Sequence, residues 1–83
     1  MLTADEFSKL TIEEQVTTLL GNGSELLERI YIYYVIKLYS LAGFFVEIWY
    51  LQTTNRIDRV IIVQLSDVIH LYESQINISD LYK

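Results

Sequence analysis

Few side chains in this 83-residue sequence are of the types that catalyse reactions or hold metal ions. There is a single histidine, His70, which lies between two apolar residues, and there are no cysteines. A metal site needs several histidine, cysteine or carboxylate ligands at set spacings, so we expect His70 to be a surface or boundary residue. The stretch 21–23 (Gly-Asn-Gly) lacks the Gly-Lys-Ser/Thr ending of a phosphate-binding loop and predicts a turn. The sequence therefore predicts no enzyme, no metal site and no cofactor.

Two pairs of acidic residues, at 5–6 and 13–14, are further candidates for acid–base chemistry. Each pair falls in the first turn of an expected helix, where carboxylates interact favourably with the helix dipole. General acid catalysis needs a carboxyl group whose pKa is raised, as burial would raise it. Nothing in the pattern around these pairs indicates burial, so we interpret them as solvated residues at helix starts.

Glu47 stands in a different setting, because its neighbours in the sequence are aromatic. In the strand register derived below, Lys37 lies opposite Glu47 and Arg59 lies diagonal to it. This arrangement predicts an ion pair on a half-buried sheet face, or alternatively a site that binds the amine or guanidinium group of a small ligand. The candidate interface or ligand cluster consists of Lys37, Tyr39, Phe45, Glu47, Trp49, Arg59 and Ile61.

The stretch from Ile30 to Leu51 must position this cluster, and it contains only two charged residues, Lys37 and Glu47. Its 22 residues are long enough to span a bilayer, which takes about 20. However, each charge costs roughly 2.5–3.5 kcal/mol near the centre of a membrane helix. The residues from 31 to 36 are β-branched or aromatic, as is typical of strands. We therefore expect a β-hairpin, with a membrane span as the disfavoured alternative.

Gly43 sets the expected register of this hairpin. It suits the left-handed position of a three-residue loop, 41–43, with a type I turn and a G1 bulge. Ser40 then pairs with Phe44, and Lys37 lies directly across from Glu47, where opposite charges stabilise a sheet modestly. A slip of one residue would send the two charges to opposite faces.

Helices are expected on both sides of the hairpin. Thr3 and Thr11 each precede a glutamate by three residues, the pattern of a capping box, which predicts a helix over roughly 3–9, a break, and a second helix ending near Leu20. Residues 24–30 are left open between helix and strand. A third strand is expected at 57–64, a helix from Ser66 to about Glu73, and a closing turn over 77–82.

The predicted fold is thus a single α+β domain over 1–83: a three-stranded antiparallel meander (31–40, 44–51 and 57–64) with two N-terminal helices and one C-terminal helix. The expected core face consists of Leu38, Val46, Ile48, Val60 and Ile62. The second face would carry Tyr33, Val35, Tyr39, Phe45, Trp49, Leu51, Ile57, Ile61 and Val63. Soluble monomers rarely expose so large an apolar patch, so either the last helix or another subunit must cover it. We favour a twofold dimer.

The net charge of −5 disfavours nucleic-acid binding, which needs a clustered basic face. The N-terminal residues are acidic and lack the layout of a signal peptide, so we expect a cytoplasmic protein. The first functional hypothesis is an interaction protein that acts as a homodimer or binds a protein partner. The alternative is a small-ligand binding module that uses the cluster around Glu47.

The run Leu38-Tyr39 followed by Phe44-Phe45-Val46-Glu47-Ile48-Trp49-Tyr50 resembles a group of small uncharacterised bacterial proteins of about this length. Further positions match their pattern: Gln15, Gly23, Leu26, Arg29, Ile57, Tyr72 and Ile76. Members of the group carry polar or turn residues just before the Leu-Tyr strand. This chain has Tyr-Ile-Tyr-Tyr at 31–34 instead, which argues against a separate early strand here. The resemblance implies a fold and no activity.

Overall fold

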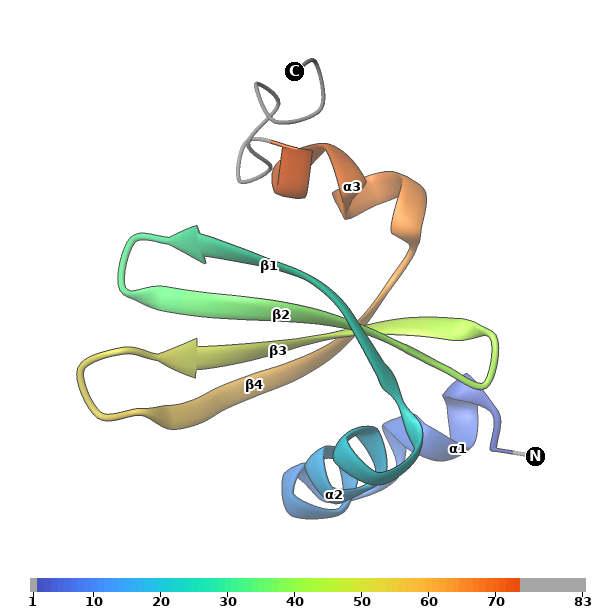
Figure 1. The fold of residues 1–83 in the computed structure, drawn as a ribbon. Helices are drawn as coiled ribbons and strands as arrows, with labels where there is room; N and C mark the ends of the chain where they lie inside the picture. Colours follow the sequence, from blue (N-terminus) through green and yellow to red (C-terminus); the bar gives the residue numbers. More distant parts are fainter. Residues whose placement is uncertain (1, 74–83) are drawn as a thin grey trace.

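The computed structural model describes residues 2–73 and has the predicted α+β class with an antiparallel sheet (Figure 1). The helices are α1 (Ala4–Ser8), α2 (Ile12–Asn22) and α3 (Leu65–Glu73). The strands are β1 (Ser24–Tyr31), β2 (Tyr34–Leu41), β3 (Phe44–Leu51) and β4 (Arg56–Val63), in the order β1-β2-β3-β4. The sheet therefore has four strands and not the predicted three. The expected closing turn at 77–82 lies outside the described residues.

Both predicted helix starts are confirmed. Thr3 Oγ1 accepts a hydrogen bond from Glu6 N at 3.1 Å, and Glu6 Oε1 accepts one from Thr3 N at 2.9 Å. Thr11 caps α2 in the same reciprocal way with Glu14. Residues 9–11 separate the two helices, as expected. Two cooperative helix starts within nine residues thus produce two short helices instead of one.

The additional strand, β1, occupies the segment that the sequence leaves open between helix and strand. It ends in a two-residue turn, Ile32-Tyr33, and β2 begins at Tyr34 and not at residue 31. Ile32 has a φ of 53°, in the left-handed region that a β-branched residue rarely adopts. The turn contains no glycine, asparagine or proline, so no local signal separates β1 from β2.

The predicted register of the central hairpin is wrong by one residue. Ala42 and Gly43 have φ values of 48° and 87° and form a two-residue turn, so Leu41 pairs with Phe44. Positive φ at both central residues defines the type I′ turn, whose twist matches that of the flanking strands. As a result Lys37 pairs with Ile48 and Glu47 pairs with Leu38. The predicted contact between Lys37 and Glu47 is therefore wrong, because they lie on opposite faces.

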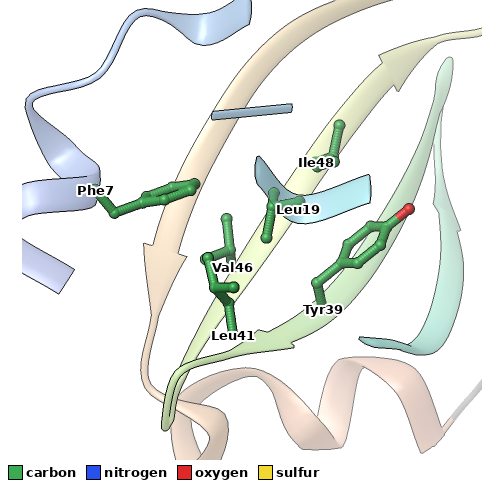
Figure 2. Packing of buried hydrophobic residues seen from close by; sticks show 6 residues of the cluster. All are labelled: Phe7, Leu19, Tyr39, Leu41, Val46 and Ile48. Carbon is green, nitrogen blue, oxygen red and sulfur yellow. The ribbon is translucent and has the colours of Figure 1, made fainter. Parts of the chain in front are cut away.

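The main core lies between the sheet and helices α1 and α2. Figure 2 shows its buried members, which come from both helices and from β2 and β3: Phe7, Leu19, Tyr39, Leu41, Val46 and Ile48. Val60 and Ile62 of β4 pack against this cluster, as the predicted core face requires. Leu38 is fully buried too, but on the opposite face, since the change of register turns every β2 side chain over relative to β3.

The second face of the sheet is covered in part by α3, which lies along the side of β1 (Figure 1). Beneath it Ile36 and Leu38 are fully buried, as is Tyr72 of α3 itself. On the β3 and β4 side this face retains five partly exposed apolar residues, which we call the open face: Phe45, Trp49, Leu51, Ile61 and Val63. These five belong to the predicted second face, whereas Val35, Tyr39 and Ile57 lie on the core side. Tyr33 lies in the turn.

No helix within residues 2–73 combines the length and apolar character needed to cross a bilayer.

Candidate functional site

A buried group of charged and aromatic side chains occupies the face beneath α3. Arg29 and Glu47 are 8% and 2% exposed, and Arg29 Nη2 lies 3.4 Å from Glu47 Oε2. The same oxygen accepts a hydrogen bond of 2.6 Å from the hydroxyl of Tyr72, which is fully buried. Trp49 Nε1 donates to the other oxygen, Glu47 Oε1, at 3.3 Å. We call these four residues the polar cluster.

Strand register explains how residues distant in the sequence meet in this cluster. Arg29 pairs with Ile36, Ile36 with Trp49, and Trp49 with Arg59, so the four residues form one row across the sheet. Glu47 lies in the adjacent row, opposite Leu38. Tyr72 reaches the cluster from α3 and donates to the Glu47 oxygen that Arg29 also contacts.

The indole of Trp49 interacts with two guanidinium groups. The Cζ atoms of Arg29 and Arg59 lie 5.5 Å and 5.1 Å from the centre of the Trp49 ring, and Arg29 Cζ also lies 5.3 Å from the ring centre of Tyr72. A guanidinium over an aromatic face is stabilised by the ring quadrupole, most strongly where it is desolvated. Arg29 is therefore held by its aromatic neighbours as well as by Glu47.

Both oxygens of Glu47 already accept hydrogen bonds, so the carboxylate is part of the folded structure and is not free to act on a ligand. Burial and, second to it, the contact with Glu47 raise the pKa of Tyr72 well above its usual range. Tyr72 consequently remains a hydrogen-bond donor. Arg29 Nε is the only buried side-chain nitrogen or oxygen of residues 2–73 without a hydrogen-bond partner. We conclude that the polar cluster anchors α3 to the sheet.

The structure brings together five of the seven residues of the predicted cluster. Phe45, Glu47, Trp49, Arg59 and Ile61 share the face that carries α3.

Lys37 and Tyr39 lie on the other face. Lys37 Nζ is 3.5 Å from Glu25 Oε1 and 3.9 Å from Glu28 Oε2, so it pairs with the edge strand β1. Tyr39 belongs to the core and donates a hydrogen bond of 3.4 Å to Glu25. Burial, with smaller effects of Tyr50 and Glu25, raises the pKa of Tyr39 to about 12.

Two members of the polar cluster, Arg29 and Tyr72, were not predicted as site residues. The sequence shows them only as matches to the pattern of the resembling bacterial proteins, and their positions depend on β1 and on the placement of α3. The one signal in the sequence that indicates a buried role for Arg29 is its position in the mostly apolar stretch 26–36. An arginine that aligns with an inward-facing row needs a carboxylate partner, and Glu47 is the nearest candidate on the same face.

The end of the sheet away from the β2–β3 turn carries four consecutive exposed apolar residues. Ile30, Tyr31, Ile32 and Tyr33 are 58%, 50%, 67% and 65% exposed, and we call them the apolar tip. Tyr33 O accepts a hydrogen bond of 2.8 Å from Gln52 N, which ties the tip to the β3–β4 loop. The ring centres of Tyr31 and Trp49 are 6.1 Å apart in an edge-to-face contact, so the tip adjoins the open face.

His70 is exposed on α3, as predicted. Across residues 2–73 no three histidine or acidic side chains are grouped closely enough to hold a metal ion. Comparison with protein-family models, with curated proteins and with solved structures yields no match to this chain.

Proposed function

We propose that this chain is a small interaction protein that self-associates through the open face of its sheet and does not act as an enzyme. The observation that supports an interaction protein most directly is the apolar surface of the open face and the adjoining tip. Four consecutive large apolar residues are half or more exposed in the tip, where hairpins normally carry glycine, asparagine or aspartate. Exposed apolar patches rimmed by polar residues are characteristic of contact surfaces.

The apolar residues of the open face are bordered by two exposed arginines, since Arg56 pairs with Leu51 and Arg59 pairs with Trp49. Arg59 lies on this face over Trp49, and Asp58 Oδ2 is 3.7 Å from Arg59 Nε. Tryptophan, tyrosine and arginine are the residues that most often dominate binding energy in protein interfaces. The apolar tip, at the end of the same surface, would serve as the contact with a second protein partner.

The alternative of a small-ligand site receives less support. Its proposed anchor, Glu47, is 2% exposed and is already bonded to Arg29, Tyr72 and Trp49. Its proposed second charge, Lys37, faces the other side of the sheet. A ligand amine would have to displace an internal guanidinium from a buried carboxylate, which would leave that guanidinium buried and without its counter-charge.

Light scattering on the purified protein tests self-association. The monomer mass is 9.8 kDa, and we expect twice this value at micromolar concentration. Ile61→Lys, on the open face, should give monomers, because it introduces a charge into the contact. Tyr33→Lys, in the tip, is the matched control and should remain dimeric. A wild-type protein that stays monomeric would contradict the proposal.

A further inference from the structure

The two outer strands of the sheet, β1 and β4, differ in how they are protected from pairing with another strand. An edge strand presents a row of unpaired backbone N–H and C=O groups, and natural proteins guard such edges with charges and bulges. β1 carries Glu25 and Glu28, and a bulge lies between Glu25 and Leu27. It is therefore guarded along much of its length.

β4 is guarded over only part of its length. Its first residues include Arg56, Asp58 and Arg59, and a bulge there leaves Asp58 without a partner in β3. From 60 to 63 it reads Val-Ile-Ile-Val, with no charge, no proline and no bulge. Within residues 2–73, the backbone of this segment makes hydrogen bonds to β3 and to no other element. This half of β4 is thus an open, apolar edge.

We infer that the second copy in the self-association proposed above, on which this inference rests, pairs its own β4 antiparallel with this edge. A twofold axis perpendicular to the sheet keeps like faces together, so each residue must oppose one of the same face. The bulge-free segment, 59–63, is centred on Ile61. Ile61 therefore opposes itself across the axis, Val60 opposes Ile62, and Arg59 opposes Val63.

The charges in the first half of β4 disfavour registers that are centred there. Centring the pair on Asp58 or on Arg59 would place two like charges directly opposite each other, which destabilises a sheet. Centring it on Ile61 places each arginine opposite an apolar residue and beyond reach of the other. The charges in the first half of β4 therefore favour a register in which the two copies pair through the uncharged second half.

Such pairing closes at two copies. The resulting eight-stranded sheet ends on both sides in β1, whose acids and bulge guard it against further addition. The contact of the open face is then its β4 border, where Ile61 and Val63 of each copy lie next to the axis, and the two open faces join side by side into one. Isologous twofold contacts of this kind are the commonest closed assembly.

The absence of cysteine from the sequence provides a direct test. Opposing residues in an antiparallel pair have Cα atoms about 4.5–5.5 Å apart, within the range of a disulfide. Ile61→Cys should therefore form a disulfide-linked dimer readily under mild oxidation. Val60→Cys and Ile62→Cys place the two cysteines at diagonal positions roughly 7–8 Å apart, beyond the usual Cα separation of a disulfide, and should cross-link far less. Leu26→Cys, on β1, is the control for random collision and should stay monomeric on a non-reducing gel.

Each variant is first examined by circular dichroism for native structure and by light scattering under reducing conditions. A reduced dimer in which Ile61→Cys cross-links no better than Leu26→Cys would overturn edge pairing and leave self-association standing. Strongest cross-linking at residue 60 or 62 would overturn the register centred on Ile61. Monomeric wild-type protein would overturn both self-association and edge pairing. Assemblies larger than dimers would contradict closure at two copies.

Discussion

Removing a single oxygen atom from Tyr72 tests whether the polar cluster holds α3 on the sheet. Tyr72→Phe keeps the buried ring, which lies over Arg29, and deletes the hydroxyl that donates to Glu47 at 2.6 Å. Hydrogen bonds to charged groups contribute about 1.5–3 kcal/mol to stability. Both partners are buried, so no water replaces the lost donor. We expect a loss of about 2 kcal/mol in the free energy of unfolding, or roughly 8–16 °C in Tm for a domain of this size.

Tyr34→Phe is the matched control, because the same atom is removed from the same residue type. The Tyr34 hydroxyl donates to Asp58 Oδ2 at 3.2 Å, and this pair is exposed to water. Its loss should cost about 0.5 kcal/mol or less. Urea unfolding followed by far-UV circular dichroism gives both values, at one protein concentration because dimerisation would contribute to stability. Equal losses in the two variants would show that the cluster does not anchor α3.

Three further predictions concern a cap, a turn and a titrating core residue. Thr11→Ala should lower the free energy of unfolding by about 0.5–2 kcal/mol, since it removes the cap of α2; unchanged urea midpoints would contradict this. Ile32→Gly should stabilise the protein by about 1 kcal/mol by relieving the left-handed φ, whereas Tyr33→Gly, whose φ is not positive, should bring no gain in Tm. Tyr39 has a pKa raised to about 12 by burial, so the folded state holds this proton more tightly than the unfolded chain. Its contribution is present below about pH 10 and is lost towards pH 12, and Tyr39→Phe should flatten the fall in Tm measured over this interval.

Local features of the fold could be predicted from the sequence, because their causes lie within a few residues. The capping boxes at Thr3 and Thr11 are complete within four residues each, and both are confirmed. The central hairpin was also located correctly, since Gly43 marks its turn. Its register was not, because the choice between a two- and a three-residue loop depended on whether Ala42 adopts a positive φ. Alanine tolerates this conformation at a cost that the twist of the sheet offsets here.

Features that depend on contacts between distant residues could not be predicted. The turn at Ile32-Tyr33 has no residue typical of turns, so β1 and β2 read as one apolar stretch. Without β1, Arg29 had no place in the sheet and Glu47 was assigned the wrong partner, Lys37. The position of α3 over β1 follows from the burial of Tyr72 against Arg29 and Glu47.

The docking of α3 on β1 also bears on the order in which the molecule folds. Every strand pairs with its neighbour in the sequence, so the sheet can zip from one hairpin to the next with little loss of chain entropy at each step. The contact of α3 with β1 joins two segments that the three other strands separate in the sequence, so it closes a long loop. We expect this contact to form after the rate-limiting step. Weakening this contact would then accelerate unfolding and leave the folding rate nearly unchanged. The docked α3 would thus slow the unfolding of a sheet that assembles without it.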